Sequence, residues 1–291
     1  MMSVLNRQAR LSKNVARAVG HSQAPSSAAP PVNPEHTFYR EVMQVLQAAQ
    51  APFLVGGGFA FACHTGISRA TKDLDLFVLP GDFSRVLDAC AAAGYRIQVR
   101  FAHWLGKVSR DDQVIDIIFS SGNGLCTVDE DWFTHAIPGV LFGLPVHLCP
   151  PEEMIWSKAF VMERERFDGA DVVHLLSVHG KTLDWARLLH RFNSHWRVLF
   201  SHLILFGFVY PSERSKVPDW LMIEFERRIR MEMTSAPPEE RLCQGTLLSW
   251  SQYLGNVEHG GYQDARHPPR GNLTREQIAA LNATFREDED K

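Results

Sequence analysis

The chain has 291 residues, of which 45% are apolar, and its net charge is −3. This length suggests one or two domains and can bury a sizeable core, and the composition is that of an ordinary globular protein. The charge is uneven, because residues 1–34 hold four basic residues and no acid, which leaves 26 basic and 33 acidic residues elsewhere, a net charge of −7. An acidic body disfavours non-specific binding of long nucleic acid.

Five cysteines are present, and no two of them form a Cys-x-x-Cys pair. Because the number is odd and the spacing lacks a metal-ligand pattern, we expect free thiols in a reducing cytoplasm rather than a disulfide framework or a zinc site. No apolar run reaches the ~20 residues that a membrane helix needs. The sequence therefore predicts a cytoplasmic protein without a membrane partner.

The first part of the chain predicts a tail followed by a mixed sheet. Residues 1–34 are predicted to be a disordered basic tail, because a weakly basic segment is followed by a Ser/Ala/Pro linker. Residues 35–149 alternate helix and strand patterns and then continue as strands, which predicts an α/β (α+β) core with a mixed sheet. Helices are expected at 35–50, 59–64 and 82–93, and strands at 52–55, 71–79, 95–101, 105–109 and 114–119, with a further strand or hairpin at 139–148.

The second part of the chain predicts a helical domain over residues 150–259. Two prolines followed by two acids mark a helix start, because the acids lie at the positive end of the helix dipole. Helices are expected at 152–167, 170–178, 182–192, 195–208 and 219–233. Residues 260–291 are predicted to be a mobile C-terminal tail that carries one helix at 274–285.

Two aspartates interrupt the apolar strand predicted at 71–79. Asp73 and Asp75 are two residues apart, so both side chains face one side of the strand with Cα atoms roughly 6.5–7 Å apart. Like charges this close raise each other's pKa and destabilise the fold. A bound divalent cation removes that cost, and hard carboxylate oxygens favour Mg²⁺ or Mn²⁺ over zinc. A solvated edge strand or turn is the alternative.

A third carboxylate, Asp116, stands alone in the apolar strand predicted at 114–119. If this strand lies beside that of Asp73 and Asp75, the three carboxylates converge, because neighbouring strands are about 4.8 Å apart. Three carboxylates are what two metal ions about 3.5–4 Å apart require. We predict Asp73 and Asp75 as metal ligands, and Asp116 as a ligand of the second ion or as a base. A salt-bridged structural role is the alternative for Asp116.

Three glycines, residues 56–58, lie between a predicted strand and a helix start. Glycine lets backbone amides approach a phosphate at a helix N-terminus, so Gly57 and Gly58 are predicted phosphate-binding residues, with a plain tight turn as the alternative. Arg69 and Lys72 precede the aspartates and are either phosphate contacts or surface charges.

Together these residues resemble the nucleotidyltransferase superfamily related to DNA polymerase β, and most closely its small bacterial AbiEii-like members. The family pattern of Gly-Gly, His-Gly, Arg-x-Thr and Asp-x-Asp is similar to Gly57-Gly58, His64 with Gly66, Arg69 with Thr71, and Asp73 with Asp75. The resemblance covers about residues 35–185. It implies the core fold of that superfamily, a nucleoside triphosphate (NTP) substrate and a divalent metal.

The resemblance also implies a role for Lys158, which interrupts an otherwise apolar helix pattern. In related families a helix lysine at this place contacts the triphosphate; the alternative is a packed lysine whose ammonium reaches solvent. Arg166, Asp168 and Asp171 resemble an Arg-x-x-Asp segment of those families. There are two departures: Gly58 stands where many catalytic relatives have serine, and the His-Gly element is one residue longer here.

We therefore expect a metal-dependent nucleotidyltransferase that uses two Mg²⁺ or Mn²⁺ ions. It would transfer NMP from an NTP, such as ATP, to a hydroxyl acceptor and release pyrophosphate. The acceptor stays open between a small molecule, a protein side chain and an RNA end. The alternative is a non-catalytic relative that binds a nucleotide or a partner protein. A DxD glycosyltransferase that uses a nucleotide sugar is disfavoured. Such an enzyme would normally need a longer nucleotide-sugar domain before the DxD motif, and only 72 residues precede Asp73.

Overall fold

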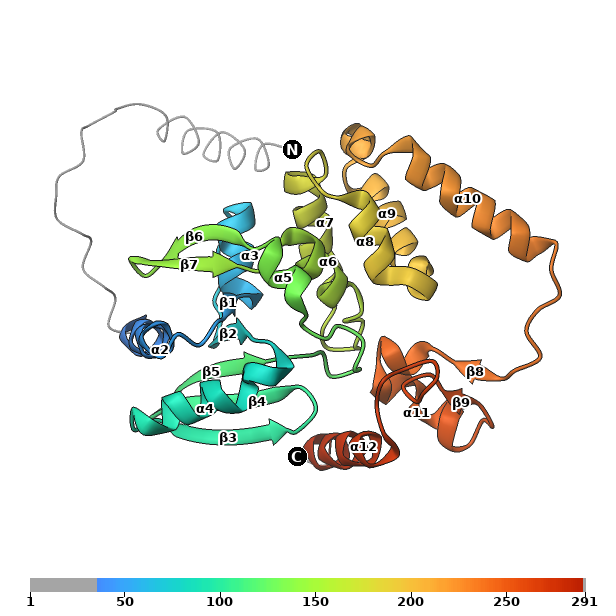
Figure 1. Ribbon diagram of the computed structural model, residues 1–291. Coiled ribbons are helices and arrows are strands. Elements are labelled where there is room, and N and C mark those ends of the chain that lie inside the picture. Colours follow the sequence, from blue (N-terminus) through green and yellow to red (C-terminus); the bar gives the residue numbers. More distant parts are fainter. Residues whose placement is uncertain (1–35, 290–291) are drawn as a thin grey trace, which may run out of the picture. The chain divides into compact units, whose positions relative to one another are not determined.

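A computed structural model describes residues 36–289, with side chains up to residue 284, and contains a seven-stranded mixed sheet (Figure 1). The strand order is β3-β4-β5-β2-β1-β7-β6. The pairs β2–β5 and β1–β7 are parallel, and the other neighbours are antiparallel. The predicted mixed sheet is confirmed, with strands β1 (Leu54–Val55), β2 (Asp73–Phe77), β3 (Arg96–Phe101), β4 (Leu105–Arg110), β5 (Gln113–Ile118), β6 (Ile137–Leu141) and β7 (Leu144–Leu148).

Helix α4 covers one face of this sheet and lies across β3 and β4 (Figure 1). A side chain at Gly106 of β4 would overlap Phe83 of α4, so Gly106 marks the covered face. In the β-ladders Gly106 is paired with Ile117, and Ile117 with Leu76, and both apolar side chains are fully buried. Side chains alternate along a strand, so the neighbouring residues Asp75 and Asp116 face the opposite side.

The helices of the first half are α2 (Thr37–Ala48), α3 (Gly57–Thr65), α4 (Phe83–Ala92) and α5 (Glu130–Thr134), with a short 3₁₀ turn, η2, at Pro80–Asp82. The predicted helices correspond to α2, α3 and α4. The short α5 was not predicted; the Asp129 carboxylate caps it by accepting a hydrogen bond from the backbone N–H of Asp131.

The second half is helical, as the sequence predicted. It contains α6 (Pro151–Ala159), α7 (Gly169–His179), α8 (Trp185–Phe192), α9 (Trp196–Val209) and α10 (Asp219–Met233), with 3₁₀ turns η3 (Asn193–His195) and η4 (Pro211–Lys216). The helix start predicted at the two prolines corresponds to α6, which begins at Pro151. One buried apolar cluster nevertheless runs from Phe38 to Phe225, and α3 packs on α7, so side chains from both halves share this core.

The single helix predicted over residues 152–167 is wrong, because α6 ends at Ala159. Tertiary hydrogen bonds explain the difference. The backbone N–H of Met162 donates to the carbonyl of Leu248, and Met162 forms an isolated β-bridge with Phe167. These partners replace the intrahelical bonds that would have extended α6, so contacts distant in sequence outweigh the local helix pattern.

The residues after α10 pack against the sheet. They form β8 (Leu242–Cys243), η5 (Gly245–Leu247), α11 (Trp250–Glu258), β9 (Gln263–Asp264) and α12 (Arg275–Glu289). Leu273, Ile278 and Leu281 form a second buried cluster that includes Phe101 of β3. The helix predicted at 274–285 corresponds to α12. The prediction of a mobile tail from residue 260 did not anticipate these buried contacts.

The disordered tail predicted for residues 1–34 lies outside the described residues. All five cysteines lie inside the described range and are free thiols. Between residues 36 and 289, none of the helices combines the length and the apolar character that crossing a membrane requires.

The same substitution at a buried and an exposed position tests the assignment of the sheet core. Ile117 of β5 is fully buried, and Ile223 of α10 is 63% exposed. We expect Ile117→Ala to lower the free energy of unfolding by about 2–5 kcal/mol, because it removes packed methyl groups and leaves a cavity. Ile223→Ala should change it by less than about 0.5 kcal/mol. Urea titrations of both variants measure the difference; equal losses would contradict the assignment.

Candidate active site

The three predicted carboxylates come together through the parallel pairing of β2 with β5. In this register Asp75 lies directly opposite Asp116, and Asp73 lies opposite Val114. Asp73 and Asp75 share a face of β2, so all three carboxylates lie on the face opposite to α4. The condition for convergence of the three carboxylates, that the two strands are neighbours, is met.

The three carboxylates repel one another. Burial, and then the nearby charges of Asp73 and Asp116, together raise the pKa of Asp75 to about 7. Burial also raises the pKa of Asp116, although Lys107 acts in the opposite direction. The hydroxyl of Tyr39 is affected too, since burial and then the charges of Asp73 and Asp75 raise its pKa. The positive groups near the cluster therefore do not fully neutralise its negative charge.

Lys107 of β4 compensates one of the three carboxylates. It lies opposite Asp116 in the antiparallel β4–β5 ladder, and its Nζ is 2.7 Å from Asp116 Oδ1. The two side chains are 29% and 13% exposed, so this ion pair is more shielded from water than a surface pair. No described residue forms a hydrogen bond or ion pair with the carboxylate of Asp73 or Asp75. These two are the uncompensated acids of the site.

The glycines place the start of α3 against Asp75. A side chain at Gly57 would overlap the Asp75 carboxylate, and Gly57 has a φ of +53°, which a residue with a side chain rarely adopts. The backbone N–H of Gly56 donates to the carbonyl of Asp75 at 2.9 Å. Gly57 therefore has a steric reason to be glycine: it lets the N-terminus of α3 approach the carboxylates.

The predicted cations Lys158 and Arg69 meet at a buried acid rather than standing free. Lys158 Nζ lies 2.7 Å from Asp171 Oδ2 and 3.0 Å from Asp168 Oδ2, and Arg69 also pairs with Asp171. Asp171 is only 2% exposed and Lys158 12%. Lys158 is still close enough to Asp75 to lower the pKa of that carboxyl, although burial and the neighbouring acids outweigh this effect.

Arg166 and Asp168 complete this ion-pair network. Two nitrogens of Arg166 donate to the two oxygens of Asp168 at 3.0–3.1 Å. Burial acts to raise the pKa of Asp168, but the bonds and charges of Arg166 and Lys158 outweigh it and lower this pKa. Asp168 is therefore held ionised between two cations.

Lys72 and His64 do not contact the carboxylates. The Lys72 side chain is exposed, and only its backbone carbonyl is engaged, by the Tyr39 hydroxyl at 3.3 Å. His64 Nε2 is 2.9 Å from the carbonyl of Cys149. Gly66 ends α3 with a φ of +73°, a conformation that glycine adopts at low cost at a helix C-terminus.

Sequence reasoning missed Lys107 and Tyr39 as neighbours of the acids. Lys107 had a usable signal, because Arg110 and Gln113 are joined by the two residues Asp111 and Asp112. Recognising that hairpin would have set the register and placed Lys107 opposite Asp116. Tyr39 had no such signal, because it approaches from α2 by tertiary packing.

The described part of the chain holds no group of three or more His, Cys, Asp or Glu side chains that is already arranged as a metal site. The pairing of Asp116 with Lys107 is consistent with this finding, since it leaves two carboxylates, Asp73 and Asp75, without a cation. Two carboxylates suit a hard oxygen-binding cation that also takes ligands from a substrate.

The chain matches no family model and no curated protein sequence. Its fold is similar to those of solved nucleotidyltransferases. The crystal structure of ANT(2")-Ia in complex with adenylyl-2"-tobramycin is 16% identical over 56% of this chain and 99% of that chain, with a TM-score of 0.40. The lincomycin-bound lincosamide antibiotic adenylyltransferase LnuA is 16% identical over 50% and 98% of the two chains, with a TM-score of 0.37. The Megavirus polyadenylate synthase is 13% identical over 63% of this chain and 39% of that chain, with a TM-score of 0.36.

The raised pKa of Asp75 predicts a dependence of stability on pH. Below about pH 4 this carboxyl is protonated in both the folded and the unfolded chain, so it has no effect there. Between about pH 4 and pH 7 the folded state binds more protons than the unfolded state, so stability falls as pH rises, by at most about 1.4 kcal/mol per pH unit. Above about pH 7 the loss is complete.

Asp75→Asn removes this titration. We measure the free energy of unfolding of both proteins with urea in EDTA. The value for the variant minus that for the wild type should rise steadily from pH 4 to pH 7 and then stay constant. Asp88→Asn, at an exposed position on α4, is the matched control and should show a constant difference. A constant difference for Asp75→Asn as well would contradict the raised pKa.

Proposed function

We propose that the chain is a metal-dependent nucleotidyltransferase that transfers NMP from an NTP to a hydroxyl acceptor and releases pyrophosphate. The observation that carries this proposal is the side-by-side placement of Asp75 and Asp116 next to Asp73, at the N-terminus of a glycine-led helix. A half-buried cluster of like charges is costly, and it is retained most readily where a cation and a polyanionic substrate share it.

Asp73 and Asp75 are the residues that would hold Mg²⁺ or Mn²⁺. Both offer oxygen ligands and lack a cation partner among the described residues, and their repulsion is relieved by a divalent ion. Such an ion neutralises charge on the triphosphate and lowers the pKa of an acceptor hydroxyl.

The remaining groups bind phosphate and move a proton. The amides at Gly57 and Gly58 begin α3, where the helix dipole favours an anion. Lys158 and Arg69 exchange the carboxylates of Asp168 and Asp171 for phosphate oxygens. Exposed Lys72 reaches the outer phosphates.

We assign Asp116 the role of base rather than ligand of a second ion, because Lys107 already balances its charge through Oδ1, while Oδ2 has no hydrogen-bond partner among the described residues and can accept a proton. The acceptor oxygen forms its bond to the α-phosphorus while the bond from that phosphorus to the bridging oxygen breaks. The acceptor proton passes to Asp116, and pyrophosphate leaves with the bridging oxygen. Atoms and charge balance without a further reactant.

A non-catalytic role in binding a nucleotide or a partner protein is the second candidate. The observation that favours it is the pairing of Lys158 and Arg69 with the buried Asp171, since an incoming triphosphate must compete with these ion pairs. Separating a buried ion pair is costly unless the new partner is equally well placed.

Titration calorimetry and product analysis distinguish the two candidates. We expect NTP binding to require Mg²⁺ or Mn²⁺, and labelled NMP to appear on an acceptor when cell extract is supplied. Asp73→Asn and Asp75→Asn should each lower the transfer rate at least a hundredfold and weaken the metal-dependent binding, whereas Asp88→Asn should do neither. NTP binding that does not depend on metal and is unchanged in both variants would contradict the catalytic proposal.

The number of bound ions tests the role of Lys107. We expect one Mn²⁺ per wild-type chain in electron paramagnetic resonance titrations with a non-hydrolysable NTP analogue. Lys107→Met frees the Asp116 carboxylate and should add a second Mn²⁺. Lys181→Met, at an exposed position in the helical half, serves as the control and should leave one ion. Two ions in the wild type would restore the two-metal arrangement and contradict the assignment of Asp116.

A further inference from the structure

A cavity outside the carboxylate site is lined by residues from three parts of the chain. Its volume is about 160 Å³. One wall comes from the end of the sheet, including Trp104 and Asn123; another from α6 and the segment after it, including Phe160 and Glu163; and a third from the C-terminal segment, including Trp250. None of Asp73, Asp75 and Asp116 lines it. This cavity has the size of an apolar cavity of about 150 Å³ that holds benzene.

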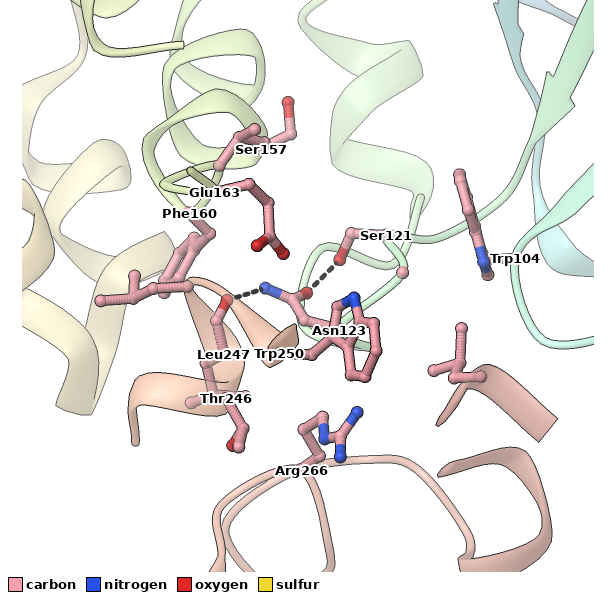
Figure 2. A pocket seen from close by; sticks show the side chains of 14 residues that line it. Trp104, Ser121, Asn123, Ser157, Phe160, Glu163, Thr246, Leu247, Trp250 and Arg266 are labelled. Carbon is pink, nitrogen blue, oxygen red and sulfur yellow. Dashed lines mark hydrogen bonds between the residues drawn. The ribbon is translucent and has the colours of Figure 1, made fainter. Parts of the chain in front are cut away.

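Glu163 gives the cavity a negative charge that no described residue neutralises. Its carboxylate accepts hydrogen bonds from the hydroxyls of Ser249 and Ser251 but pairs with no cation in the described range. Figure 2 shows this carboxylate pointing toward Asn123 and the middle of the cavity. Glu163 is half-buried, and a carboxylate partly shielded from water attracts a cation more strongly than one on the open surface, so a positively charged ligand would be stabilised there.

The other charged group of the cavity is already balanced. Arg266 is 1% exposed and donates to both carboxylate oxygens of Asp264, at 2.7–3.1 Å, and to Asn282. Its positive charge is therefore not available to an anionic ligand. The net charge facing the cavity is that of Glu163.

The aromatic walls and one open hydrogen-bond donor define the rest of the ligand. Phe160, Trp104 and Trp250 line the space with π surfaces, which attract a cation as well as a ring. The indole Nε1–H of Trp104 is buried and has no acceptor among the described residues. The Asn123 side chain has little hydrogen-bonding capacity left for a ligand. Its Oδ1 accepts from the Ser121 hydroxyl, and its Nδ2 donates to the carbonyl of Leu247 (Figure 2).

From these contacts we propose that the cavity is a binding site for a small amine that carries one ring. The ammonium pairs with Glu163, and the ring lies between the aromatic walls. An acceptor atom on a larger ligand of this class takes the hydrogen of Trp104 Nε1. This proposal is independent of nucleotidyl transfer, because it uses none of the residues assigned to that reaction.

Benzylamine, benzyl alcohol and benzoate serve as probes of similar size and different charge. In ¹H–¹⁵N spectra of the full chain, the indole resonance of Trp104, assigned by loss of that peak in Trp104→Phe, should shift saturably with millimolar benzylamine. Benzyl alcohol should bind at least tenfold more weakly, and benzoate should cause no saturable shift. No shift with benzylamine, or equal affinity for all three probes, would overturn the proposal.

Glu163→Gln keeps a hydrogen-bond acceptor for the two serines and removes only the charge. We expect it to bind benzylamine at least tenfold more weakly and to lose the preference over benzyl alcohol. Glu165→Gln, two residues along at an exposed position outside the cavity, is the matched control and should bind like the wild type. Unchanged benzylamine affinity in a folded Glu163→Gln variant would contradict the assigned ammonium partner. If that variant does not fold, the wild-type comparison of the three probes still decides.

Discussion

The parallel pairing of β2 with β5 is the constraint on which the rest of the site depends. It places Asp75 beside Asp116, and Asp73 lies two residues before Asp75 on the same face of β2. The opposite face of these strands is fully apolar, with Leu74, Leu76, Ile115 and Ile117 buried beneath the helices. A slip of one residue would turn the acids into that core, so hydrophobic burial fixes the position of the carboxylates. The burial of apolar side chains on the other face offsets the electrostatic repulsion among the three carboxylates.

Around this cluster most acidic side chains form ion pairs with lysine or arginine, but two of them do not. Lys107 holds Asp116, while Lys158, Arg69 and Arg166 hold Asp168 and Asp171. Asp73 and Asp75 are left over, and burial together with the neighbouring acids raises the pKa of Asp75. A metal ion and a triphosphate together fit this imbalance better than either alone. In the function proposed above, the ion would balance the charge of Asp73 and Asp75, and the phosphates would replace the acids now bound to Lys158 and Arg69. A triphosphate alone would add negative charge beside two unpaired carboxylates.

The sequence predicted those features that depend on local pattern and failed where tertiary partners decide. Alternation along β2 and β5 was enough to place the acids on one face, and glycine spacing located the start of α3. The end of α6 was missed because Met162 bonds to Leu248, 86 residues away in the chain. The packing of the C-terminal segment was missed because Leu273 and Ile278 find their apolar partner in Phe101, far away in the sequence. The pairing of Lys158 with Asp171 was also beyond local reasoning, since only the packing of α6 against α7 brings them together.

The glycine at position 58, where the family resemblance leads one to expect serine, has a packing reason. A Cβ atom at this position would lie 3.3 Å from the Cβ of Thr71 and 3.4 Å from its hydroxyl oxygen. The Thr71 hydroxyl is itself held in place, because it donates to the carbonyl of Asp73 at 3.0 Å. A serine at position 58 would therefore press on the residue that fixes the start of β2. Gly58 thus leaves room for the Thr71 side chain, whose hydroxyl stabilises the start of β2.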